Sequence, residues 1–411
     1  MAFVQESMVV FGVLIIIVLA GLLAMYLSRK LRISEIFLLL VMAVILKLTA
    51  SLDFFIKLNL SFLNSLLIVL VSLYVFHYYQ KSMELKEHHV QLHMLKTILA
   101  VLAMNTVILG MFFALIFYTK LSTEALLYGF LCAMILSGIE IGHLKYHKKY
   151  QNHRAIRFLN AESHFIPFFV LVYGYTILNL ISKYSLAQSS PGSPAGEAVK
   201  LFISSIIIGI GIGMIVSLVV FRIMRQFYNK IASPLFLLIM TVIAYMIAEM
   251  IGGDGVYTAI VMGMFFAKVS LKKKEELSLS LQPFYDYLLI FLVIFLGLSF
   301  DFPSQAKLYW FAFLLFILSL ILRAIAINVL WDNKVKKLCL GRKEKIFTSM
   351  VTSRGPVLCL LILSLLANLE LADAFSTIIT VSFLVLLYSI ILSTILMLFF
   401  SRHLLEETGD F

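Results

Sequence analysis

Residues 307–331 read KLYWFAFLLFILSLILRAIAINVLW, an apolar stretch that carries a single arginine, Arg323, near its middle. Its length exceeds the roughly 20 residues that a helix needs to cross the ~30 Å hydrocarbon core of a bilayer. An arginine at that depth costs roughly 2.5–3.5 kcal/mol on insertion scales and must be paired or hydrated to persist. The stretch therefore predicts a membrane-spanning helix that brings a positive charge into a polar interior.

Similar apolar segments recur along the chain, which has 411 residues, of which 62% are hydrophobic and 13% charged. This composition, with a mean hydropathy of +1.02, excludes an ordinary soluble protein. We predict an all-α polytopic membrane protein with about 13 transmembrane helices in the lipid bilayer. The predicted spans are approximately 8–27, 33–50, 61–79, 95–118, 123–144, 158–182, 200–222, 233–251, 255–270, 284–300, 307–331, 346–367 and 375–400.

The net charge of +11 is concentrated in alternate loops, of which residues 145–157 and 334–345 are the most basic. The intervening loops are poor in lysine and arginine, as the positive-inside rule describes for membrane proteins. The pattern predicts a cell (plasma or inner) membrane protein with its N-terminus outside and its C-terminus in the cytoplasm. It argues against a nucleic-acid partner, and no soluble partner can be inferred. Three scattered cysteines are too few for a disulfide framework or a metal cluster.

Two further ionisable residues lie inside predicted spans. Glu162 follows shortly after the start of 158–182, in the sequence Asn160-Ala161-Glu162-Ser163-His164-Phe165-Ile166-Pro167. It either reaches back to the cytoplasmic interface or turns inward, where it is the candidate partner of Arg323, because a buried arginine needs an acid or several carbonyls. Arg354 lies in Ser353-Arg354-Gly355-Pro356, where glycine and proline predict either a broken helix lining a cavity or a simple kink.

A fourth group surrounds Glu140, at the end of span 123–144. Glu140, His143 and His147 share one helical face and have the spacing of metal ligands. The lysines around them favour a solvated face, so we predict no metal site, and the same holds for His88, His89 and His93. The loop Ser189–Pro194 divides two similar hydrophobic halves, as in inverted-repeat transporters. Gly209, Gly211 and Gly213 predict a close helix contact.

These residues occur in the same order as the motifs of a known family. The chain resembles the monovalent cation/proton antiporters, in the sodium/proton exchanger branch with thirteen spans. The residues that carry the resemblance are Leu31–Ile36, Tyr245, Ala248-Glu249, Gly253-Asp254-Gly255, Ala259–Gly263, Leu320–Ile327 and Arg354-Gly355. The resemblance implies an inverted-repeat antiporter fold with broken helices crossing in its core. It also implies that Glu162 pairs with Arg323 and that Ser163 lies near the ion.

The sequence departs from the family where the cation normally binds. The span 6 motif of the family ends in Asn-Asp, and the matching residues here are Ile166 and Pro167. The Thr-Asp-Pro motif of span 5 becomes Ile139-Glu140-Ile141. Antiport needs a carboxylate that holds either a cation or a proton, and a glutamate paired with arginine releases protons less usefully near neutrality. The candidate ion and proton ligands are therefore Glu140, Glu162, Ser163 and His164, with Glu140 as the better carrier.

The resemblance further implies a transport part (approximately 95–182 and 307–400), a scaffold part (8–79 and 233–300) that forms a homodimer interface, and a linker helix (200–222). We predict a secondary antiporter that exchanges Na⁺ or K⁺ for protons by alternating access, with no cofactor beyond the transported ions. The alternative is a transport-inactive relative that acts as a sensor or partner subunit. An enzyme is not indicated, since no nucleophile elbow, zinc motif or phosphate loop occurs.

Overall fold

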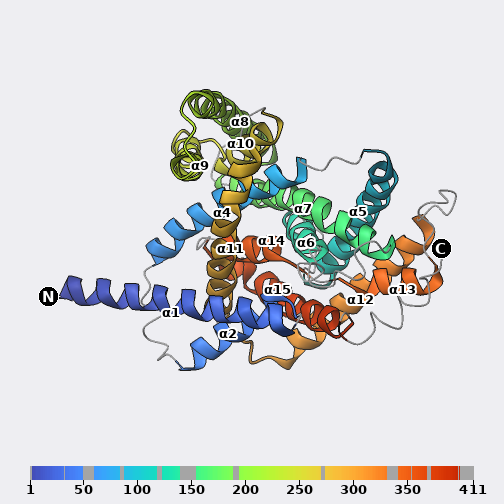
Figure 1. Cartoon of the computed structure of the whole chain (residues 1–411). Helices are drawn as coiled ribbons and strands as arrows, with labels where there is room; N and C mark the ends of the chain where they lie inside the picture. Colours follow the sequence, from blue (N-terminus) through green and yellow to red (C-terminus); the bar gives the residue numbers. More distant parts are fainter. Residues whose placement is uncertain are drawn as a thin grey trace. The chain divides into compact units, whose positions relative to one another are not determined.

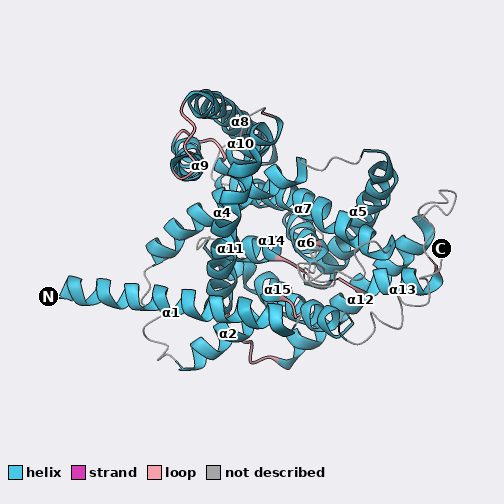
Figure 2. Cartoon of the chain, in the orientation of Figure 1, coloured by secondary structure: helices cyan, strands magenta, loops and turns pink. Residues whose placement is uncertain are grey.

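The structure is a computed structural model. It describes residues 2–31, 33–49, 60–83, 88–117, 123–138, 154–187, 194–269, 274–330, 341–352, 354–367, 372–396 and 398. Within these ranges every regular element is a helix, as Figure 2 shows. The predicted all-α class is confirmed.

The helices follow the predicted spans closely, and Figure 1 labels them in chain order. They are α1 (Ala2–Leu31), α2 (Glu35–Thr49), α4 (Leu60–Met83), α5 (His88–Phe117), α6 (Thr123–Ser137), α7 (Arg154–Ala187), α8 (Pro194–Gln226), α9 (Ala232–Met250), α10 (Gly255–Lys268), α11 (Lys274–Ser299), α12 (Ala306–Leu330), α13 (Arg342–Met350), α14 (Pro356–Ala367) and α15 (Ala372–Ile395). Each predicted span overlaps one helix, except that span 346–367 overlaps two, α13 and α14.

Seven of the described helices are long and apolar enough to cross a membrane by themselves, namely those within α5, α7, α8, α9, α11, α12 and α15. Shorter apolar stretches lie within α4, α6, α10 and α14. Together they establish a polytopic membrane protein, whereas the count of 13 spans stays a prediction.

The chain forms two compact units. Unit 1 comprises residues 1–59, 87–170 and 290–411, and unit 2 comprises residues 60–86 and 171–289. In unit 1, α12 packs against α5, α13 and α15, and α14 packs against α6 and α15. In unit 2, α10 packs against α4, α8 and α9. The predicted assignment of spans to a scaffold part, a transport part and a linker helix stays a prediction.

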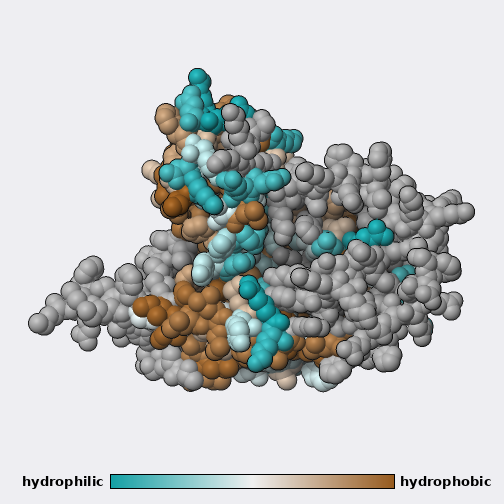
Figure 3. Space-filling view, in the orientation of Figure 1, coloured by the Kyte–Doolittle hydropathy of each residue, from teal (hydrophilic) through white to brown (hydrophobic). Residues whose placement is uncertain are grey.

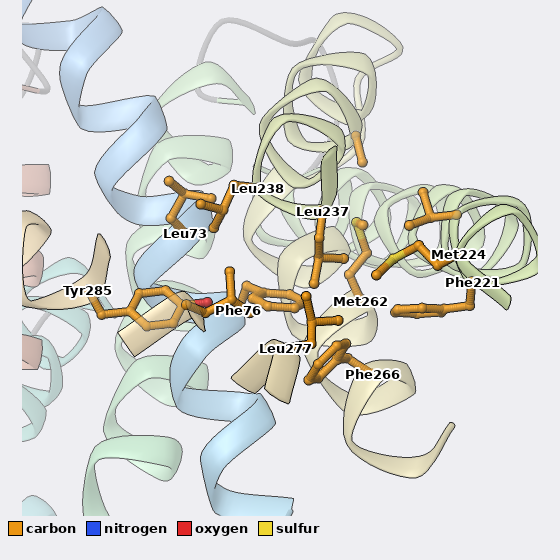
Figure 4. Packing of buried hydrophobic residues seen from close by; sticks show 13 residues of the cluster. Leu73, Phe76, Phe221, Met224, Leu237, Leu238, Met262, Phe266, Leu277 and Tyr285 are labelled. Atoms are coloured by element: carbon orange, nitrogen blue, oxygen red, sulfur yellow. The ribbon is translucent and has the colours of Figure 1, made fainter. Parts of the chain in front are cut away.

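The interior of unit 2 is a cluster of apolar side chains contributed by α4, α8, α9, α10 and α11, shown in Figure 4. Phe266 of α10 lies close to two other rings of the cluster, with its ring centroid 5.7 Å from that of Phe76 and 5.9 Å from that of Phe221. Fully buried aromatic and aliphatic side chains of this kind give dense packing, which holds helices together where lipid supplies no hydrophobic driving force.

Large apolar side chains also cover outward faces of the helices. Ile207, Ile215 and Leu218 of α8 are 63–64% exposed, and Figure 3 shows brown apolar residues over much of the described surface. A soluble protein rarely leaves contiguous apolar areas of this extent open to water. The faces are suited to contact with lipid chains.

Two of the three glycines in the predicted small-residue face of α8 lie against α10. A Cβ at Gly213 would stand 2.9 Å from the carbonyl oxygen of Thr258 and 2.9 Å from Cβ of Val261, and one at Gly209 would overlap the backbone of Asp254. Thr258 Oγ1 donates to the carbonyl of Gly209 at 2.8 Å, which is a direct hydrogen bond between the two helices. Gly211 faces open space. The predicted close contact is therefore made by Gly209 and Gly213.

We expect Gly213→Ala to destabilise the protein and Gly211→Ala to leave it unchanged or slightly stabilised. Both substitutions gain the same helix propensity, about 1 kcal/mol, but only the first forces α8 away from α10, at a cost of about 1–3 kcal/mol. Thermal unfolding of the purified variants in detergent measures the difference. Equal unfolding midpoints of the two variants would show that the stability of the protein does not depend on this contact between α8 and α10.

Candidate functional site

Glu162 and Arg323 form a bidentate ion pair in the interior of unit 1. Arg323 Nη1 donates to Glu162 Oε1 and Arg323 Nη2 donates to Glu162 Oε2, each at 2.5 Å. The side chains are 0% and 1% exposed. The planar guanidinium matches the two carboxylate oxygens, so the pair has the geometry in which Arg–carboxylate attraction is strongest. Glu162 therefore does not reach back to the interface, and both of its oxygens are occupied.

A third helix completes the coordination of Arg323. Its Nε and Nη2 donate to the carbonyl oxygen of Thr348, at 3.2 Å and 3.0 Å. Thr348 lies in the last turn of α13, where carbonyls have no partner within the helix and the helix dipole is negative. The hydroxyl of Thr348 donates to Glu344 O at 2.7 Å and so steadies the same turn. The pair thus joins α7, α12 and α13.

The chain is non-helical between α13 and α14. Helix α13 ends at Met350, α14 begins at Pro356, and Val351, Thr352, Arg354 and Gly355 lie between them. Proline suits the first position of α14, because it has no N–H to leave unpaired there. The break frees backbone groups within the predicted membrane span, which are tolerated at that depth when protein or water surrounds them. Ser353 lies outside the described residues.

Arg354 is buried in this break and is poorly satisfied. It is 2% exposed, and its Nη2 donates to the hydroxyl of Ser319 in α12, at 3.4 Å. Within the part of the chain that the structure describes, its Nε and Nη1 have no hydrogen-bond partner. Cys132 of α6 and the guanidinium of Arg323 lie within electrostatic range. Among the described groups, its electrostatic neighbours are therefore a thiol and a second guanidinium.

The remaining predicted residues of α7 do not join the ion pair. Ser163 Oγ donates to the carbonyl of Asn160 in its own helix, at 2.8 Å. Ile166 is buried, and Pro167 lies inside α7, where it has no N–H to donate to the carbonyl of Ser163. His164 is part of α7, but its side chain lies outside what the structure describes.

Glu140, His143 and His147 all fall within 139–153, outside the described residues, so their predicted roles stay predictions. The side chains of His88, His89 and His93 are not described either. Among the side chains that the structure does describe, no three of histidine, cysteine, aspartate and glutamate gather in an arrangement suited to a metal ion.

Sequence reasoning missed four groups in or near this site. Ser319 lies four residues before Arg323 and faces Arg354, and its helical spacing from Arg323 was a usable signal. The backbone carbonyl of Thr348 could not be singled out from the sequence, because every residue has a backbone carbonyl. Ser382 of α15 and Cys132 lie next to one another, and neither occupies a motif.

Comparisons with known proteins agree with this geometry. A family model described as "Sodium/hydrogen exchanger, transmembrane" matches residues 13–398. A structure of the sodium proton antiporter MjNhaP1 from Methanocaldococcus jannaschii at pH 8 is similar in fold, with a TM-score of 0.67 and 17% identity over 96% of this chain and 100% of that one. A second structure of MjNhaP1, from an electron-microscopy map, gives a TM-score of 0.66 and 17% identity over 98% and 99%. No curated protein matches the chain in sequence.

We expect Arg323→Ala to lower the free energy of unfolding by roughly 3–5 kcal/mol, because it leaves Glu162 charged, buried and unpaired. Thermal unfolding in detergent measures the loss. Asp301→Asn is the control, since Asp301 pairs with Lys47 at 2.7 Å but is 88% exposed, and an exposed pair contributes only about 0–1 kcal/mol. Similar melting of Arg323→Ala and Asp301→Asn would contradict a stabilising role for the buried pair.

Proposed function

The chain belongs to the family of transmembrane sodium/hydrogen exchangers, and from this premise we propose that it is a secondary antiporter exchanging a monovalent cation, Na⁺ or K⁺, for protons. The observation that carries the proposal is the buried Glu162–Arg323 pair beside the break between α13 and α14. Charges and free backbone groups inside a membrane protein are expensive and mark ion pathways. Such exchange proceeds by alternating access, without enzymatic chemistry or a cofactor.

The coupling residue is Glu140 in this proposal. A carrier must be free to bind either a cation or a proton, and both oxygens of Glu162 are already held by Arg323. The two positions that provide Asn-Asp in the family are a buried isoleucine and a proline, which offer no carboxylate. Glu140 lies two residues beyond Gly138, inside the predicted core span 123–144, whose other acid, Glu124, stands at the opposite end. Ser163 and His164 are additional candidate ligands.

The proposal includes the family arrangement of a moving transport part and a dimeric scaffold part. The predicted boundaries are retained: 95–182 and 307–400 for transport, and 8–79 and 233–300 for the scaffold, with 200–222 as a linker. The membrane is the cell (plasma or inner) membrane, with the N-terminus outside and the C-terminus in the cytoplasm. The alternating basic loops support this orientation.

One observation favours a second candidate function, a transport-inactive relative acting as a sensor or partner subunit. Ile166 is 1% exposed and Pro167 interrupts the hydrogen bonding of α7, so this part of α7 is apolar where family members bind a cation. The Glu162–Arg323 pair also has a structural role, because it joins three helices. An inactive relative retains that role.

Inverted vesicles with a pH-sensitive dye distinguish the two candidates. We expect pulses of Na⁺ or K⁺ to dissipate a preformed pH gradient, and Glu140→Gln to abolish the response because the amide binds no proton in exchange. Asp301→Asn is the control and keeps the wild-type response. Absence of any response in folded wild-type protein would reject antiport, and an intact response in Glu140→Gln would reject Glu140 as the carrier.

A further inference from the structure

Helix α7 belongs to both compact units. Its residues 154–170 are part of unit 1, and its residues 171–187 are part of unit 2. One continuous helix of 34 residues therefore passes from one unit into the other. A helix with regular hydrogen bonding bends only gently, and sharp bends occur at prolines and similar interruptions. The residues around position 170 therefore decide how readily one unit can turn against the other.

The second half of α7 is fixed to unit 2 by two side-chain hydrogen bonds. Asn179 Nδ2 donates to Oδ2 of Asp254 at 2.6 Å, and the hydroxyls of Thr176 and Tyr257 are hydrogen-bonded at 2.5 Å. Asp254 is the N-cap of α10, where its Oδ1 accepts from the backbone N–H of Val256 at 2.8 Å. Since a carboxylate strengthens the hydrogen bonds that it accepts, this contact ties α7 firmly to the start of α10.

The first half of α7 is fixed to unit 1 by the ion pair. Glu162 binds Arg323 of α12 with both of its carboxylate oxygens. The two anchors, Glu162 in unit 1 and Asn179 in unit 2, are roughly 25 Å apart along a helix that rises 1.5 Å per residue. Any turning of one unit against the other therefore has to be taken up by the part of α7 between them.

That part of α7 is interrupted on both sides of the boundary between the units. Pro167 lies inside the helix and has no N–H for the carbonyl of Ser163. Gly174 follows the boundary, and a glycine in a helix interior costs about 1 kcal/mol relative to alanine because its backbone is freer. The hydroxyl of Thr176 donates to the carbonyl of Val172 at 2.6 Å, a contact that often bends helices. Each feature lowers the cost of bending α7 where it changes units.

Helix α11 also passes between the units, at residue 290, but without such an interruption. No proline or glycine lies within four residues of that position. Its one internal proline, Pro283, lies among residues held by unit 2, because Leu281 and Tyr285 on either side of it both belong to the apolar cluster of that unit. Of these two helices, α7 is therefore the one that bends more easily.

We propose that α7 is a hinge between unit 1 and unit 2, and that the bend is confined to the segment from Pro167 to Gly174. Residues 154–166 then move with unit 1, and residues 175–187 move with unit 2. Pro167 thereby has a conformational role at the position where the family motif provides an aspartate. The hinge does not depend on the proposed exchange, because it is measured as a distance in protein without an ion gradient.

Distances between pairs of spin labels, measured by pulsed electron paramagnetic resonance on the full chain in lipid nanodiscs, test the hinge. Arg157→Cys and Ser185→Cys place the labels on exposed residues near the two ends of α7. Cys339 is replaced by serine, and the other two native cysteines, Cys132 and Cys359, are buried. We expect a broad distance distribution with a mean below the roughly 42 Å of a straight helix of that length.

A label pair at Ile203 and Val219 gives the reference width, because both residues are exposed on α8, which lies wholly in unit 2. Pro167→Ala and Gly174→Ala should each narrow the α7 distribution toward this reference and shift its mean toward the straight-helix value. Alanine restores the missing N–H in the first and stiffens the backbone in the second. If one variant fails to fold, the other still decides.

Pro283→Ala is the matched control, since it removes a helix-internal proline whose two flanks are held by the same unit. It should leave the α7 distribution unchanged. The proposal is overturned by a wild-type α7 distribution as narrow as the α8 reference, or by no change in the folded variants Pro167→Ala and Gly174→Ala. Equal narrowing in Pro283→Ala would also overturn it, because the effect would then not be local to α7.

Discussion

The bidentate contact between Glu162 and Arg323 is the constraint on which the interior of unit 1 depends. Removing two such ions from water costs several kcal/mol each, and this cost is recovered only with good geometry and complete hydrogen bonding. The geometry is bidentate, and four of the five N–H groups of the guanidinium are hydrogen-bonded, because Nε and Nη2 also donate to Thr348 O at the end of α13. Since that carbonyl is available only where α13 stops, the ion pair and the interrupted helix support one another.

Much of the fold was predictable because a bilayer imposes a length on every apolar segment. The pairing of Glu162 with Arg323 followed from the need of a buried arginine for an acid. The exact extent of helices did not follow: α1 extends from Ala2 to Leu31, beyond the predicted 8–27. Water satisfies backbone groups outside the bilayer, so polar residues such as Arg29 continue a helix where hydropathy predicts its end.

The groups around Arg354 were not predictable from the sequence. Serine and cysteine are common in membrane helices, and only the packing of the helices brings Ser319 of α12 and Cys132 of α6 near one arginine. Within the described interior of unit 1, the replacement of Asn-Asp by Ile166 and Pro167 leaves that part of α7 without the carboxylate of the family motif.

The seam between α8 and α10 has a mechanical consequence. Gly209 and Gly213 are one helical turn apart, and each leaves room for the backbone of α10. Turning α8 about its axis, or sliding it by one residue, would bring a bulky isoleucine into that space. The two helices can therefore pack closely in only one register. The relative position of α8 and α10 is thereby fixed by the shape of their contact.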